Sequence, residues 1–163
     1  MNGPRLIATC LGIGTLPGAP GTWASAAAIA LAWGLHAAGG FAAVGLLTVA
    51  LGLLGYWATA RTLDGRAEDP PEVVIGEVVG MLIALWPLSI GLGQIGAEWH
   101  LWPWPGWVVG FLLFRFFAIV RPPPVNWAGR LAGPLGVMLD DIVAGVMTAL
   151  IVVVAAGVAH GWF

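Results

Sequence analysis

The sequence predicts an all-α fold: a polytopic integral membrane helical bundle of four to five membrane helices with a glycine-rich N-terminal segment. Three observations predict it. The chain has 163 residues, of which 60% are hydrophobic, and it contains 25 glycines. Only 9% of the residues are charged, against about 25% in a typical soluble domain. Apolar stretches of membrane length recur along the chain. We treat residues 1–163 as one membrane-embedded domain.

The composition also excludes several classes of protein. Six basic and eight acidic residues are too few to cover the surface of a soluble protein of this size. The net charge of −2 and the lack of a basic stripe exclude a nucleic-acid partner. Cys10 is the sole cysteine, so the chain has no internal disulfide framework.

Five apolar segments follow one another, separated by glycine, proline and charged residues. The first is short and can either span the membrane or re-enter it, and Gly39-Gly40 separates it from the second. The most polar connection is residues 61–72, and a loop rich in proline and glycine precedes the last segment. The predicted segments are residues 23–38, 41–60, 73–92, 107–120 and 136–163.

Arginines predict the orientation of these segments. If the segments alternate across the membrane, the arginines outside them share one side, and the positive-inside rule makes that side cytoplasmic. These are Arg5, Arg61, Arg66, Arg121 and Arg130. A group of tryptophans marks the opposite interface as an aromatic belt. These are Trp99, Trp102, Trp104 and Trp107. We expect the three histidines, His36, His100 and His160, to be interfacial side chains.

Four ionisable side chains lie inside the apolar segments: Glu77, Arg115, Asp140 and Asp141. Each costs about 2.5–3.5 kcal/mol near the centre of a membrane helix. All four fall one to two turns from a predicted cytoplasmic helix end, so we expect them at one depth. Carboxylates packed that closely repel one another unless a cation lies among them, and oxygen ligands suit Mg²⁺. The three carboxylates are therefore the predicted metal ligands and catalytic residues.

Simpler interpretations of these charges stay open. Adjacent residues of a helix point about 100° apart, so one aspartate can bind the ion while the other orients a water or pairs with Arg115. The two aspartates could instead only compensate the helix dipole. Glu77 could form a buried ion pair with Arg115.

Two further features favour an anionic ligand. Residues 12–22 are rich in glycine and precede a helix, so the backbone amides of Gly21 and Thr22 can face an anion. The alternative is a plain helix start with Thr22 as its N-cap. Arg121 begins an Arg-Pro-Pro-Pro run that holds its guanidinium at the interface, where it can bind a phosphate or serve only as a topology anchor.

Three blocks of the chain together resemble the phosphatidylglycerophosphatase A family of bacterial lipid phosphatases. They are residues 12–23 (GIGTLPGAPGTW), residues 77–81 (EVVGM), and residues 114–122 (FRFFAIVRP) continuing to residues 136–145 (GVMLDDIVAG). The resemblance implies a magnesium-dependent phosphatase of the bacterial inner membrane, with its active face cytoplasmic. Its substrate would be a membrane phospholipid, phosphatidylglycerophosphate, and its product phosphatidylglycerol.

The resemblance also suggests a role for each site residue. Glu77, Asp140 and Asp141 would hold Mg²⁺ and act in catalysis, and Arg115 and Arg121 would bind the phosphate with the Gly21 and Thr22 amides. Either water attacks directly or a carboxylate first forms a phospho-enzyme. The oligomeric state stays undetermined.

The chain departs from the family pattern at three positions. Gly76 and Ala118 stand where the family has aspartates, and Arg121 stands where it usually has lysine. The alternative function is therefore a homologue that binds lipid phosphate without turnover. A small ion-translocating protein is a further alternative, but the almost wholly apolar residues 142–158 weigh against it.

Overall fold

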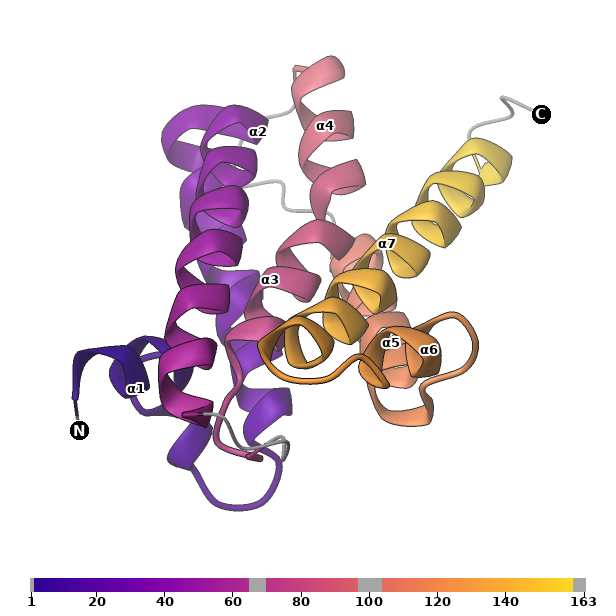
Figure 1. Ribbon diagram of the computed structural model, residues 1–163. Helices are drawn as coiled ribbons and strands as arrows, with labels where there is room; N and C mark the ends of the chain where they lie inside the picture. The colour runs from indigo at the N-terminus through magenta and orange to yellow at the C-terminus, as the bar shows by residue number, and fades with distance from the viewer. Residues whose placement is uncertain (1, 65–69, 97–103, 160–163) are drawn as a thin grey trace.

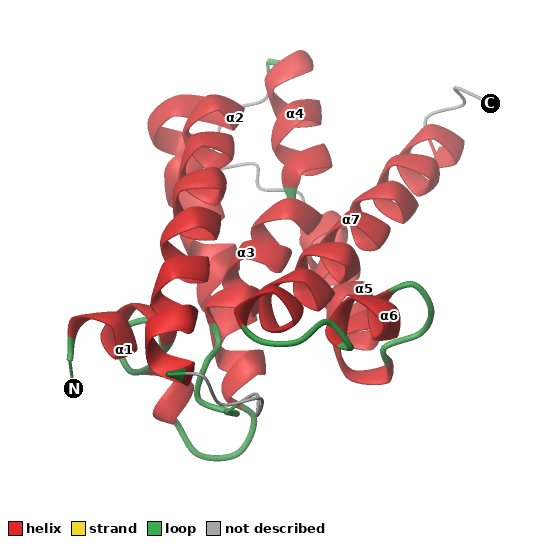
Figure 2. Ribbon diagram, viewed as in Figure 1, coloured by secondary structure: helices red, strands yellow, loops and turns green. Residues whose placement is uncertain are grey.

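The computed structural model describes residues 2–64, 70–96 and 104–159. In this part of the chain, helices are joined by turns and no strand occurs (Figure 2). The all-α prediction is therefore confirmed. Arg66, Trp99, Trp102, His100 and His160 lie outside the described residues, so the predictions made for them are not addressed.

Within the described ranges, three helical stretches are long and apolar enough to cross a membrane. They are α2 (Pro20–Leu63), the stretch Ile75–Gln94 and α7 (Pro134–Ala159). The apolar helix α5 (Trp104–Val120) is shorter. Short helices complete the fold: α1 (Gly3–Ala8), η1 (Ile13–Thr15) and α6 (Val125–Gly129).

The helix α2 is a hairpin of two limbs. Its backbone leaves the helical conformation at Gly39 and Gly40, and the φ of +60° at Gly40 is one that glycine adopts without steric cost. The chain turns back there, so that the limbs before and after the glycines lie side by side (Figure 1). The predicted break between the first two segments is confirmed.

The predicted boundaries differ from the structure in three places. The N-cap of α2 is Ala19, not Thr22, because Pro20 already occupies the first helical turn. The third segment is divided at Leu85 into α3 (Ile75–Ala84) and α4 (Trp86–Gln94), since Pro87 has no amide to continue the α3 ladder. The loop before the last segment contains α6.

The helix α3 forms the centre of the molecule and packs against α7 and α2 (Figure 1). Small residues let α3 and α7 approach closely. A β-carbon at Gly80 would collide with the carbonyl oxygen of Asp141, and one at Gly145 would collide with the carbonyl oxygen of Gly80. This contact places the first turns of α3, which carry Glu77, beside the first turns of α7, which carry the aspartates.

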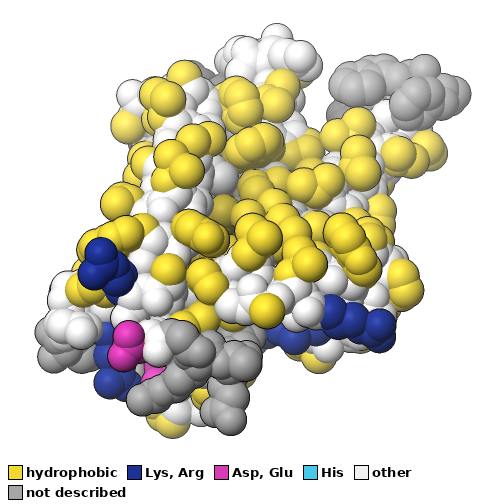
Figure 3. All heavy atoms as spheres, viewed as in Figure 1, with side chains coloured by type: hydrophobic (Ala, Val, Ile, Leu, Met, Phe, Trp, Pro, Cys, Tyr) yellow, Lys and Arg dark blue, Asp and Glu magenta, His cyan; other side chains and the backbone are white. Residues whose placement is uncertain are grey.

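Charged side chains gather at one end of the molecule. On the face drawn in Figure 3, arginine and acidic side chains lie in the lower part, near α1 and α6, and hydrophobic side chains cover the rest. The lower end also holds the start of α2, α3 and α7 (Figure 1). His36 lies just before the Gly39-Gly40 turn, where it is buried and its Nδ1 lies 2.8 Å from the Ser89 hydroxyl. Its predicted interfacial position stays a prediction.

Candidate active site

Three elements meet where α2 begins. Gly21 is buried in the first turn of α2, and an added β-carbon there would collide with Glu77 Oε1 and lie 3.1 Å from Arg115 Nη1. The carboxylate and the guanidinium are therefore within roughly 6 Å of each other, since both border the same point. The N-terminus of α2 adds its own partial positive charge beside Glu77. The predicted meeting of Glu77, Arg115 and Gly21 is observed.

Arg115 carries an orphaned donor in this cluster. Its Nη1 donates to the hydroxyl of Ser25 at 3.4 Å, and its Nε is buried with no hydrogen-bond partner in the described part of the chain. Buried donors in proteins are nearly always satisfied, so an orphan needs an explanation. An anion bound beside Gly21 would supply the missing acceptor.

Ser25 is a site residue that the sequence analysis missed. It is completely buried, and its hydroxyl donates to the Gly21 carbonyl at 2.7 Å while it accepts from Arg115. One side chain thus links the first turn of α2 to the guanidinium. A signal was present in the sequence, because Ser25 is the lone polar residue in the alanine-rich run 24–32.

Asp141 lies against the first turn of α3. A β-carbon at Gly76 would lie 2.5 Å from Asp141 Oδ2, so this carboxylate fills the space beside Gly76. The Cα atoms of Gly76 and Glu77 are about 3.8 Å apart, as consecutive Cα atoms are. The Cα of Glu77 is therefore within about 8 Å of Asp141 Oδ2. Asp141 thus faces the Gly76 position, and the side chain of Glu77, the next residue, leaves α3 about 100° away from it.

Asp140 points to a different partner. Its Oδ2 lies 2.9 Å from Arg121 Nη2, and its Oδ1 accepts from the Asp141 amide at 2.8 Å. The Asp140 side chain is 4% exposed, whereas Arg121 is 48% exposed. A buried carboxylate thus anchors a half-exposed arginine. Asp140 pairs with Arg121 and not with Arg115, the partner that the sequence analysis weighed.

The predicted metal ligands and amide donors are only partly grouped. Among the described residues, no three His, Cys, Asp or Glu side chains are placed together closely enough to hold a metal ion. The Thr22 amide donates to the Ala19 carbonyl at 2.9 Å. Gly21, one position earlier, carries one of the first-turn amides that have no acceptor within a helix.

Ser25→Ala should lower phosphomonoesterase activity about fivefold to tenfold, because a charge-assisted hydrogen bond that holds Arg115 is lost. Steady-state phosphate release from the purified variant measures the effect. Ser89→Ala is the matched control, since Ser89 is equally buried but contacts His36 in the opposite half of the bundle. Equal losses in the two variants would contradict the role given to Ser25.

Cys10 lies in the turn after α1, close to Glu77. Burial, and secondarily the negative charge of Glu77, raise the pKa of the Cys10 thiol to about 12 from its usual 9.0. At pH 8 the thiolate fraction should therefore be about a thousandfold below that of a free thiol. We expect N-ethylmaleimide to alkylate Cys10 correspondingly slowly until SDS unfolds the protein. Alkylation of the folded protein at the rate of free cysteine would refute the placement of Cys10 beside Glu77.

The fold and the site together define a class: a helical protein with membrane-length apolar helices and with arginine and carboxylate side chains gathered at one end. Comparison with known proteins identifies the family. The family model described as phosphatidylglycerophosphatase A matches residues 6–156. The chain belongs to this family, whose characterised reaction makes it a phosphoric monoester hydrolase.

Individual relatives agree with this assignment. The chain is 33% identical to phosphatidylglycerophosphatase A of Escherichia coli K12 over 91% of this chain and 81% of that protein. It is 30% identical to phosphatidylglycerophosphatase A of Haemophilus influenzae over 93% and 88%. A Bacteroides thetaiotaomicron protein, provisionally named a phosphatidylinositol-3-phosphatase, is 36% identical over 93% and 92%. No solved structure matches the chain.

Proposed function

We propose that this protein removes the terminal phosphate of phosphatidylglycerophosphate and yields phosphatidylglycerol. Two of its relatives carry the name of this activity, and the third is named for another phospholipid that bears a phosphate monoester. The bacterial origin of these relatives and the apolar helices support a place in the bacterial inner membrane. The gathering of arginines at one end supports an active face on the cytoplasmic side.

One observation carries the proposal: the orphaned Nε of Arg115. A phosphate monoester has several acceptor oxygens, and guanidinium groups bind such oxygens in pairs. The Glu77 carboxylate already fills the space on the β-carbon side of Gly21. A phosphate oxygen that satisfies the Arg115 Nε would therefore approach Gly21 from the side of its amide. Such an arrangement aims positive charge at the phosphoryl oxygens, where charge changes during the reaction.

Arg121 would supply a second guanidinium to the site. Its ion pair with Asp140 fixes the position of the guanidinium. The Arg-Pro-Pro-Pro run supports this placement, because α5 ends there and the prolines cannot extend it. In this proposal, Asp140 is a positioning residue for Arg121.

We further propose that the enzyme uses Mg²⁺. The three-carboxylate cage expected from the sequence is not grouped among the described residues, yet Mg²⁺ commonly binds one or two carboxylates together with substrate phosphate oxygens and waters. Glu77 on α3 and Asp141 on α7 would supply the carboxylate oxygens of such a site. Asp140 would take part through a water. When bound, the ion would neutralise phosphate charge and lower the pKa of a water.

The alternative of a homologue without turnover receives no support from the comparisons, because the relatives are named as phosphatases. The structure supports an acidic group near position 76, because the Asp141 carboxylate occupies the space beside Gly76. Ala118 packs against the hydrophobic core.

Phosphate release by the purified protein in detergent tests the proposal. With phosphatidylglycerophosphate we expect turnover that stops in EDTA and returns with added Mg²⁺. Phosphatidylinositol 3-phosphate and phosphatidic acid, assayed in parallel, establish the headgroup preference. Full activity in EDTA would contradict the role of the ion, and turnover of phosphatidylinositol 3-phosphate alone would contradict the proposed substrate.

A further inference from the structure

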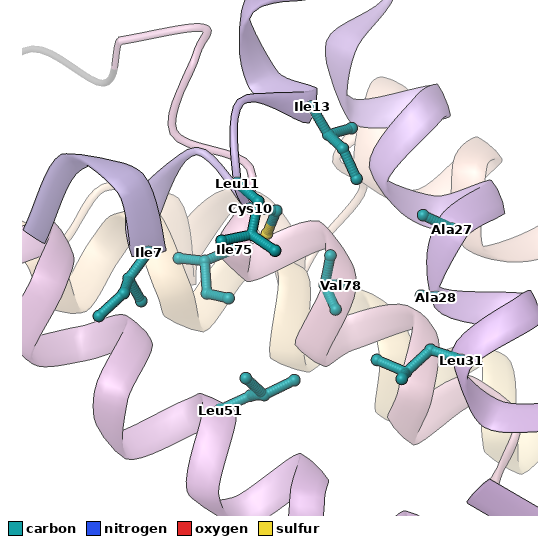
Figure 4. A pocket seen from close by; sticks show the side chains of 10 residues that line it. All are labelled: Ile7, Cys10, Leu11, Ile13, Ala27, Ala28, Leu31, Leu51, Ile75 and Val78. Atoms are coloured by element: carbon teal, nitrogen blue, oxygen red, sulfur yellow. The ribbon is translucent and has the colours of Figure 1, made fainter. Parts of the chain in front are cut away.

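An apolar cavity of about 340 Å³ lies next to the candidate active site. It is bordered by the turn after α1, both limbs of α2 and the start of α3, and all of its lining residues are apolar (Figure 4). Its volume is within the usual range of about 300–1,000 Å³ for pockets that hold small ligands. The residues that matter below are Cys10, Leu11, Ala27, Leu31, Ile75 and Val78.

The cavity lies near the site, although its lining does not include Gly21, Glu77 or Arg115. Val78, in the lining, directly follows Glu77 in α3. On α2, the lining begins with Ala27, less than two turns after Gly21. A lipid whose phosphate is bound at Arg115 would therefore have an apolar cavity within two helical turns of its headgroup.

The cavity also opens to the outside through apolar residues. Leu11 is 79% exposed and Leu31 is 38% exposed, whereas Ile75 and Val78 deeper in the cavity are buried. In Figure 4, Leu31 and Leu51 extend from the two limbs of α2 into the space that Ile75 and Val78 border. An apolar opening of this kind suits a hydrocarbon chain that enters from the bilayer.

We propose that the cavity binds one acyl chain of the phospholipid whose phosphate occupies the site. The position of the lipid headgroup in this inference rests on the proposed function. The position of the acyl chain rests on the cavity. The apolar lining matches hydrocarbon, and the end of the cavity formed by Val78, the residue after Glu77 in α3, would face the headgroup. The cavity then determines how strongly the enzyme prefers long-chain lipids over short-chain analogues.

Filling the cavity tests this assignment. Ala27 lines it, and Ala30, three positions further along the same helix, is exposed and does not. We expect Ala27→Phe to raise KM about tenfold for dioleoyl phosphatidylglycerophosphate and to leave the dihexanoyl lipid within about twofold. Ala30→Phe should change neither. If Ala27→Phe does not fold, Leu31→Trp can be used instead, because it fills the cavity at its open end. Equal effects on both lipids, or on neither, would overturn the proposal.

A second readout needs no activity, so it separates failure of this inference from failure of the proposed function. Wild-type protein in vesicles is irradiated with phosphatidylglycerol that carries a diazirine at the end of one acyl chain. We expect labels on the buried Ile75 and Val78, reduced at least fivefold in Ala27→Phe and unchanged in Ala30→Phe. Labels spread over exposed residues alone, or a stable dimer that covers Leu11 and Leu31, would overturn the proposal.

Discussion

Asp141→Asn is expected to lower kcat for phosphate release about 10²–10³-fold, the range seen when one preorganised electrostatic group is removed from an active site. Asparagine has nearly the shape of aspartate, so the carboxamide can fill the space beside Gly76 and the fold should persist. What the asparagine lacks is the negative charge beside the first turn of α3. The same charge loss at Glu77, in Glu77→Gln, should have an effect of similar size.

Asp64→Asn provides the matched control for Asp141→Asn. Asp64 is exposed at the C-terminal end of α2, with φ of +45°, a conformation that asparagine tolerates well. Its activity should equal that of the wild type. Asp140→Asn distinguishes the role of Asp140 from that of Asp141. Because this variant loses the ion pair that holds Arg121, its KM should rise more than its kcat falls. An Asp141→Asn enzyme with wild-type kcat would refute the catalytic assignment.

Gly80→Ala is expected to destabilise the protein by about 2–3 kcal/mol and to abolish most of its activity. The added methyl group would collide with the Asp141 carbonyl and lie 2.7 Å from Phe114 Cε2. A backbone carbonyl cannot rotate away as a side chain can, so α3 and α7 must separate. For a chain of this size, such a loss lowers Tm by about 5–10 °C, which thermal unfolding in detergent measures.

Gly91→Ala is the control for this substitution. Gly91 lies in α4, and a β-carbon there would meet nothing within 4 Å. Its Tm should equal or slightly exceed that of the wild type, since alanine favours helix more than glycine does. A Gly80→Ala protein as stable and active as Gly91→Ala would show that the close α3–α7 contact does not position the site.

The parts of the fold that could be predicted were those that follow from local chemistry. Hydrophobicity predicted the apolar helices, and the glycine pair 39–40 predicted the turn within α2. Pro87 divides α3 from α4. The third segment was predicted as continuous because its average hydropathy hardly changes at a single proline. Thr22 was a plausible N-cap by residue type, yet Pro20 fixes an earlier helix start.

For the site, the cost of burying charge singled out candidate residues but did not predict their partners. Glu77, Arg115 and Asp141 were singled out because charged groups in apolar segments need a reason to be there. The pairing of Asp140 with Arg121 depends on how the chain turns after α5, which includes a φ of +50° at Arg121. Ser25 was missed because a lone serine among alanines carries little signal until the packing shows what its hydroxyl touches.

An experimentally determined structure with orthovanadate and Mg²⁺ would test the central claim most directly. Vanadate mimics the phosphoryl group, and we predict that its oxygens lie about 3 Å from Arg115 Nε and the Gly21 amide, with the ion between the vanadate and the carboxylates of Glu77 and Asp141. Vanadate bound only at Arg5 or Arg61, with the Arg115 Nε still lacking an acceptor, would contradict the account.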